Sequence, residues 1–256
     1  AMLVDVGARY GLVGLIAGAA IVAIAVLVLT GVIRADNLAT LVIVVTIVAA
    51  VAYFSVILGS RRIDATERSR VWAFLPLFIT SVAFWSLYQQ QFTVLTIYSD
   101  QRLDRNLFGW EMPVSWVQSI NPVFIILLSG TFALIWTKLG DRAPAAPLKF
   151  AAGTVVMGVA FLAFIPFAST KANSTPLIAV IGILFLFTVA ELLLSPVSLA
   201  LATRLAPAAF RGQMVALQFL SVAIGTALAG TLATYYSAQD QVRYFAVLGG
   251  VAIGAG

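Results

Sequence analysis

Long apolar runs constrain the fold of this chain more than any other feature of its sequence. They fall at residues 10–33, 38–58, 71–98, 114–137, 148–168, 176–203 and 212–236, and an eighth run begins near Tyr244 and reaches Gly256. About 20 residues of apolar helix cross the ~30 Å hydrocarbon core of a bilayer. The first seven runs are long enough to cross, while the eighth is too short, so we expect that the chain is cut inside its last span.

The composition agrees with a membrane-embedded chain. It is 62% hydrophobic and 10% charged, whereas a soluble domain carries about 25% charged residues. The net charge of +5 does not indicate a nucleic-acid partner, because basic residues collect in the cytoplasmic loops of membrane proteins. With the N-terminus inside, ten basic residues are cytoplasmic and five are outside. We therefore predict an all-α, polytopic helical bundle in the cell membrane.

The absence of two residue types narrows the possible chemistry. The chain has no cysteine and no histidine, which removes thiolate ligands, cysteine nucleophiles, the commonest general base and the commonest metal ligand. We predict that the protein is not an enzyme and uses no metal and no cofactor.

The basic stretch SRRIDATERSR, residues 60–70, is the best candidate boundary in the chain. The two runs before it carry almost no polar residues and are predicted to form a transmembrane helix pair, residues 1–70. Residues 71–256 are predicted to form the main transmembrane bundle.

One acidic residue lies deep in an apolar run. Nine of the ten acidic residues lie in loops or at span ends, and the tenth, Glu191, lies in the middle of the run 176–203. An ionisable group at this depth is costly to insert, and such groups usually mark a ligand or ion pathway. We predict that Glu191 handles a ligand or a proton; a structural carboxylate paired across helices is the alternative.

Other polar residues in the apolar runs are predicted to converge with Glu191 on one wet cavity. In the stretch FWSLYQQQ, residues 84–91, α-helical periodicity places Trp85, Tyr88 and Gln89 on one face, whereas Gln90 and Gln91 are predicted to point towards neighbouring helices. Further runs contribute Asn121 and Gln218.

Two prolines adjoin this polar set. Asn121 precedes Pro122, and Ser195 precedes Pro196. Proline removes a backbone donor inside a helix, so both prolines are predicted as gating positions where a helix bends, and Ser195 is predicted to join the substrate-binding residues.

Five segments in order resemble the C-terminal half of the proton-coupled oligopeptide transporters, within the major facilitator superfamily. They are FWSLYQQQ, SINPVFIILLSGTFALIW, LGDRAPAAPLKFAAG, AELLLSPVSLALATRLAP and FRGQMVALQFLSVAIGTALAG. The resemblance covers residues 71–256, and the pair 10–58 resembles the extra helices that bacterial members insert between two six-helix halves. It implies a symporter that imports di- and tripeptides with protons by alternating access, with the N-terminal six-helix half as the missing partner.

The resemblance also implies roles for individual residues. The family's glutamate in the AELLLSP segment falls on Glu191 and is associated with the ammonium group of the peptide. The family's asparagine in the INP segment falls on Asn121 and hydrogen-bonds the peptide.

Two positions depart from the family pattern. Gln89 stands where members commonly have a carboxylate, which weakens one gating and proton-coupling element. Gln218 stands where members have tryptophan, which is expected to change the side-chain pocket and the specificity. A relative that carries another small solute is therefore an alternative. A non-transporting membrane scaffold subunit is a second alternative, but a scaffold would not need Glu191 and the amides that are predicted to face the cavity.

Overall fold

The computed structural model describes residues 18–19, 22–23, 26–34, 37–169 and 171–256. The chain divides into two compact units, Ala1–Val42 and Ile43–Gly256. In the first unit, Asn37 closes a turn: its Oδ1 accepts a hydrogen bond from the Arg34 N–H at 2.8 Å, and its Nδ2 donates to the Val32 carbonyl at 2.8 Å. Half of the predicted run 10–33 lies outside the described residues.

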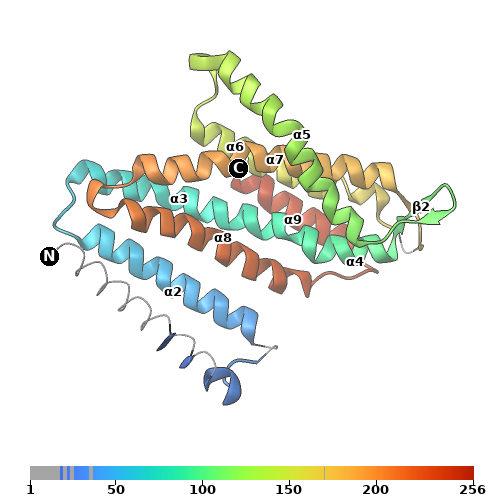
Figure 1. The fold of residues 1–256 in the computed structure, drawn as a ribbon, viewed down its shortest axis with the longest axis horizontal. Helices are drawn as coiled ribbons and strands as arrows, with labels where there is room; N and C mark the ends of the chain where they lie inside the picture. The colour runs from blue at the N-terminus through green and yellow to red at the C-terminus, as the bar shows by residue number, and fades with distance from the viewer. Residues whose placement is uncertain (1–17, 20–21, 24–25, 35–36, 170) are drawn as a thin grey trace. The chain divides into compact units, whose positions relative to one another are not determined.

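Helices dominate the described part of the chain, and the strands are two-residue pairs (Figure 1). The order of elements is α2 (Leu38–Gly59), α3 (Ala65–Tyr88), η1 (Gln89–Phe92), α4 (Val94–Gln101), β1 (Leu103–Asp104), β2 (Asn106–Leu107), β3 (Trp110–Glu111), α5 (Ser115–Leu139), η2 (Gly140–Arg142), α6 (Ala146–Leu162), η3 (Ile165–Phe167), β4 (Thr175–Pro176), α7 (Leu177–Leu205), η4 (Ala208–Phe210), α8 (Arg211–Ala233) and α9 (Gln241–Ala255). The predicted all-α fold class is confirmed.

Six of the described helical segments are long and apolar enough to cross a membrane. They are Leu38–Gly59, Ala65–Gln101, Ser115–Arg142, Ala146–Phe167, Leu177–Leu205 and Ala208–Ala233, and Gln241–Ala255 is a shorter apolar helix. Each corresponds to a run predicted from the sequence, so the chain is a multi-pass membrane protein.

The third span begins earlier than its apolar run. Asp64 caps α3 by accepting a hydrogen bond from the Glu67 N–H at 2.7 Å, and the Glu67 carboxylate accepts one from the Asp64 N–H. This reciprocal capping box satisfies two backbone donors at the start of the helix. The Glu67 side chain also accepts a hydrogen bond from the Ala208 N–H at 3.0 Å. This bond links the start of α3 to η4, the turn before α8. The division of the chain at residue 70 stays a prediction.

Glycines allow two sets of helices to pack closely. α3 and α8 lie side by side, and α6 contacts both α7 and α9 (Figure 1). A Cβ built at Gly225 of α8 would lie 2.7 Å from the Trp85 Cβ, and one at Gly158 of α6 would lie 2.7 Å from the Gly249 carbonyl oxygen. A side chain at either position would clash with the neighbouring helix, so glycine is what lets these membrane helices pack closely.

Two apolar clusters hold the second unit together. One lies around α4, α6, α7 and α9 and includes Tyr98, Phe161 and Phe245; the other joins α2 to α3 and α8 and includes Ile57 and Phe74. The second cluster anchors the C-terminal part of α2 to the bundle. α5 is more loosely held and contacts mainly α7, which it crosses obliquely (Figure 1).

Candidate functional site

Glu191 lies at the midpoint of α7 and is half-buried. Its Oε2 accepts a hydrogen bond from the Tyr88 hydroxyl at 2.8 Å, which joins α7 to the C-terminal end of α3. Among the residues that the structure describes, no lysine or arginine forms an ion pair with Glu191. The carboxylate is thus oriented by a neutral donor, and its charge has no protein counterion in this part of the chain.

Asn121 of α5 is the centre of the polar network. Its side chain is buried, with 1% exposure. Nδ2 donates to the Tyr88 hydroxyl oxygen and to Gln91 Oε1, each at 3.2 Å. Oδ1 accepts a longer hydrogen bond, 3.4 Å, from the Thr188 hydroxyl, whose shorter bond of 3.0 Å goes to the Leu184 carbonyl. The network therefore connects α3, η1, α5 and α7 around one amide.

Gln91 belongs to this network, although the sequence pattern predicted that it points away. The cause is η1, a turn of 3-10 helix at Gln89–Phe92 that follows α3. In a 3-10 helix, residues three apart lie on the same side, because each turn contains three residues. Tyr88 and Gln91 are three apart, and both hydrogen-bond to Asn121. The run of three glutamines was the available sequence signal for polar contacts here. The assumption that the α-helix continues through it gave the wrong direction for the Gln91 side chain.

Thr188 also escaped prediction. It lies three residues, or about one turn, before Glu191 on α7, so the two side chains share a helix face. The structure buries Thr188 completely. Its position one helical turn from Glu191, the acidic residue deep in the same apolar run, was the sequence signal that could have identified it.

Trp85 packs beside the network. Its ring meets the Tyr88 ring edge-on, with centroids 5.2 Å apart, and contacts Phe84 in the same way at 5.6 Å. Its indole N–H is buried and has no hydrogen-bond partner within the described part of the chain. Trp85 therefore borders the site and leaves one donor unused.

Gln89 and Gln90 face α8 instead. Gln89 Nε2 donates to the Thr226 hydroxyl at 3.0 Å, and Gln90 Nε2 donates to the Ala229 carbonyl at 3.2 Å. The three consecutive glutamines therefore serve two interfaces: Gln91 faces Asn121, and the other two bind α3 and η1 to α8. The structure does not bring the predicted site residue Gln89 together with Glu191.

Gln218 lies in a separate buried cluster between α3 and α8. Its Nε2 donates to the Ser81 hydroxyl at 3.1 Å, and Ser81 and Ser221 share a hydrogen bond of 2.7 Å. Gln218 therefore does not belong to the Asn121 network, and the convergence of all these polar groups on one cavity stays a prediction. Because α8 packs along α3, the polar residues of α8 named here hydrogen-bond to the segment Ala65–Phe92 and not to Glu191 of α7.

The hydroxyl of Ser195 is not part of the network; the backbone carbonyl of Ser195 accepts a hydrogen bond from the Ser198 hydroxyl at 2.9 Å. Pro122 and Pro196 are exposed, and α5 and α7 continue as helices through them. Their gating role stays a prediction.

Within the described residues, no group of three or more acidic side chains could hold a metal ion.

The arrangement suits a ligand that carries a cation beside an amide. The Glu191 carboxylate can pair with an ammonium group, and such charge-assisted hydrogen bonds are stronger than neutral ones. Asn121 offers both donor and acceptor groups, held in place by Tyr88 and Gln91. Asn121, Tyr88 and Glu191 were all predicted from the sequence, and the structure places them in direct contact.

The comparisons with known proteins all point to one family. A model of the POT family matches residues 19–249. The chain is 38% identical over 92% of its length to the uncharacterized transporter YclF of Bacillus subtilis, and 32% identical over 85% to a di-/tripeptide transporter of Lactococcus lactis subsp. cremoris. These matches cover 49% and 45% of the two relatives, so the chain spans about half the length of the curated relatives it matches.

A solved structure of a transporter is also similar to the chain, both in sequence and in fold. The crystal structure of a mutant of peptide transporter POT in complex with alafosfalin superposes with a TM-score of 0.84 at 37% identity. The match covers 93% of this chain and 50% of that one.

Proposed function

The chain belongs to the POT family, the proton-coupled oligopeptide transporters, and on that premise we propose that it forms the C-terminal half of a symporter for di- and tripeptides. Peptides enter the cell with protons as this half rocks against a complementary N-terminal six-helix half in the cell membrane. The substrate site lies between the halves, as in transporters built from structural repeats.

One observation carries the proposal. Glu191 is a carboxylate at mid-membrane depth, oriented by Tyr88 and without a cationic partner among the described residues. A buried charge without a counterion is unfavourable, so the position is best explained by a cation that the substrate brings. The free amino terminus of a peptide is such a cation.

Asn121 supplies the second contact. Its Nδ2 donates to the same Tyr88 hydroxyl that donates to Glu191. A substrate whose ammonium group meets Glu191 would present its first peptide group to this region. An amide that both donates and accepts matches a peptide group.

Uptake by the complete protein tests the proposal. We expect proteoliposomes that contain this chain joined to its complementary half to accumulate a labelled dipeptide when an inward proton gradient is applied. Unlabelled di- and tripeptides should compete, and a protonophore should abolish the accumulation. Uptake of another amine-bearing solute without competition by peptides would support a relative with a different substrate, and absence of any uptake would support a scaffold subunit.

A further inference from the structure

Gln118 lies in the first turn of α5, three residues before Asn121. Residues at this spacing share one face of a helix. The Gln118 Nε2 donates a hydrogen bond to the hydroxyl of Thr96, in α4, at 2.9 Å. The Thr96 hydroxyl donates in turn to the backbone carbonyl of Gln91 at 3.3 Å. Through one hydroxyl, Gln118 is therefore linked to the residue whose side chain accepts a hydrogen bond from Asn121.

The face of α5 that carries Asn121 thus contacts the segment around Gln91 at two points. Asn121 bonds to the Gln91 side chain in η1, and Gln118 bonds to Thr96 beyond the break between η1 and α4. The Gln118 contact is the shorter of the two, 2.9 Å against 3.2 Å. Two contacts one turn apart fix both the height and the rotation of α5, and the direction of the Asn121 amide depends on both.

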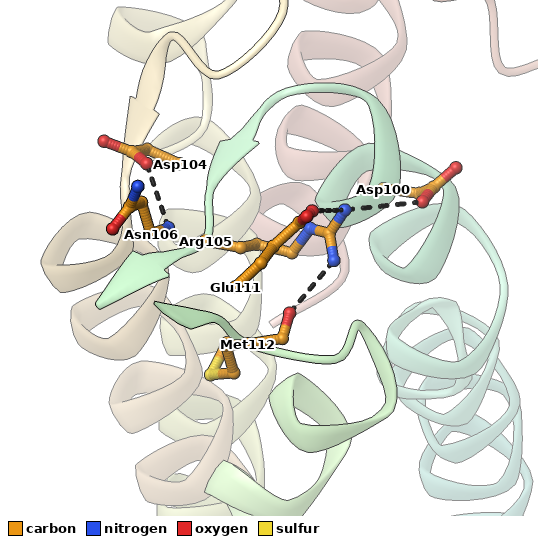
Figure 2. A network of polar contacts seen from close by, with 6 residues as sticks. All are labelled: Asp100, Asp104, Arg105, Asn106, Glu111 and Met112. Carbon is orange, nitrogen blue, oxygen red and sulfur yellow. Dashed lines mark hydrogen bonds and ion pairs between the residues drawn. The ribbon is translucent and has the colours of Figure 1, made fainter. Parts of the chain in front are cut away.

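Arg105 holds the residues just before α5 in the same way. It lies between β1 and β2, and Figure 2 shows its guanidinium pairing with Glu111 at 2.6 Å and with Asp100 at 3.9 Å. The guanidinium also donates to the Met112 carbonyl at 2.9 Å. Because Asp100 belongs to α4, these contacts tie the end of α4 to the approach to α5.

The rest of α5 is held within this chain mainly by apolar packing. Its two buried residues, Val117 and Asn121, both lie in the first two turns. Further along, Phe124 meets Phe185 of α7 edge-on, with ring centroids 5.5 Å apart. Apolar burial is non-directional, whereas a hydrogen bond weakens when its angle changes. The polar contacts near the N-terminal end of α5 are therefore what specifies its rotation.

We propose that Gln118 is a positioning residue for substrate binding: through Thr96 it fixes α5 so that the Asn121 amide meets the peptide. The inference rests on the proposed function, in which Asn121 bonds to a peptide group. Gln118 itself needs no contact with the substrate. Its effect on binding therefore passes through Asn121, and a residue that only supports folding would not show this dependence.

A double-mutant cycle on the complete protein tests the proposal. Gln118→Met keeps the length of the side chain but removes the donor to Thr96, so the affinity for a dipeptide should fall about two- to tenfold. In an Asn121→Ala background the same change should have little further effect, because no amide is left to position. Equal losses in the two backgrounds would overturn the proposal, since Gln118 would then act without Asn121.

Variants of Thr96 test the same contact from its other side. Thr96→Val removes the shared hydroxyl and should lower dipeptide affinity by a similar factor, whereas Thr96→Ser keeps the hydroxyl and should restore binding. Thr203→Val is the matched control, because the Thr203 hydroxyl bonds only to carbonyls of α7, its own helix. Equal affinities for Thr96→Val and Thr203→Val would overturn the proposal.

The position of α5 can also be measured without substrate. The chain contains no cysteine, so nitroxides can be attached at Lys138→Cys and Arg211→Cys in the complete protein, with any cysteine of the complementary half replaced. Both positions are exposed, one in the last turn of α5 and the other at the start of α8. Position 138 lies about 30 Å along the helix from Gln118, so a small rotation of α5 is magnified there.

We expect the distance distribution from pulsed electron paramagnetic resonance to shift or broaden in Gln118→Met and to match the wild type in Thr203→Val. An unchanged distribution in Gln118→Met would overturn the positioning role. Failure of the wild type to bind any dipeptide would instead contradict the proposed function, and the distance distribution would still decide whether Gln118 positions α5.

Discussion

Gln89, the first residue of η1 at the end of α3, contacts α8 through one donated hydrogen bond, from Nε2 to the Thr226 hydroxyl at 3.0 Å. Position 89 is where transporters of this family commonly carry a carboxylate. Gln89→Glu would reproduce the donor only while the carboxyl group is protonated, because a carboxylate cannot donate. We therefore expect uptake by this variant to match the wild type at low pH and to fall more steeply as pH rises.

A matched variant separates the effect of a negative charge at position 89 from the loss of the hydrogen bond to Thr226. Gln89→Met lacks the donor at every pH, so its uptake should be lowered by a similar factor across the range. If Gln89→Glu is expressed normally and keeps the wild-type pH profile, position 89 plays no part in proton coupling.

Gln91 is predicted to position Asn121 and not merely to fill space. Gln91→Met keeps the length of the side chain but removes the acceptor for Asn121 Nδ2. A neutral hydrogen bond is worth about 0.5–1.5 kcal/mol, so peptide affinity should fall about two- to tenfold. Gln90→Met is the control, because Gln90 is equally buried at 2% exposure but bonds to α8. Equal affinities for the two variants would mean that Gln91 does not orient the substrate site.

At the scale of elements, the contact between α3 and α8 depends on the absence of a side chain at Gly225. A methyl group there would meet the Trp85 Cβ at 2.7 Å and the Val82 carbonyl at 2.8 Å. We expect Gly225→Ala to force the helices apart and to lower the melting temperature of the purified protein. The displaced Trp85 ring also borders Tyr88, so peptide affinity should fall too.

Gly230→Ala on the same helix is the matched control. Nothing lies within 4 Å of a Cβ at this position, and alanine favours helix over glycine by about 1 kcal/mol. Its melting temperature should equal or exceed that of the wild type. Equal melting temperatures for both alanine variants would show that α3 and α8 tolerate a wider separation.

The helical elements were largely predictable, because apolar runs of membrane-spanning length leave few alternatives. The run 71–98 falls within the segment Ala65–Gln101, and the difference at its start arises from polar capping residues that hydropathy ignores. Glu191, Asn121 and Tyr88 were predictable for a related reason: a polar group in an apolar run needs a partner. Gln91 was not, because its direction depends on one turn of 3-10 helix. The position of Gln218 was also unpredictable, since helix pairing decides which polar groups meet.

At the scale of the whole molecule, the proposed mechanism requires two halves. Alternating access moves one half against the other around a shared site. We expect proteoliposomes that contain only this chain to show no peptide uptake under an inward proton gradient, while the chain joined to its complementary half is active. Saturable, gradient-driven uptake by the chain alone would contradict the two-half mechanism.

The central claim is that Glu191 binds the ammonium group of the substrate, and a binding titration of the complete protein tests it most directly. Glu191→Gln preserves the shape of the side chain and its ability to accept from Tyr88, but removes the charge. Loss of a charge-assisted hydrogen bond of about 1.5–3 kcal/mol should weaken binding of a free dipeptide roughly ten- to a hundredfold. The N-acetylated dipeptide should bind the wild type poorly and lose little more in the variant. Equal losses for the two peptides would contradict the claim and would assign Glu191 to folding or proton transfer.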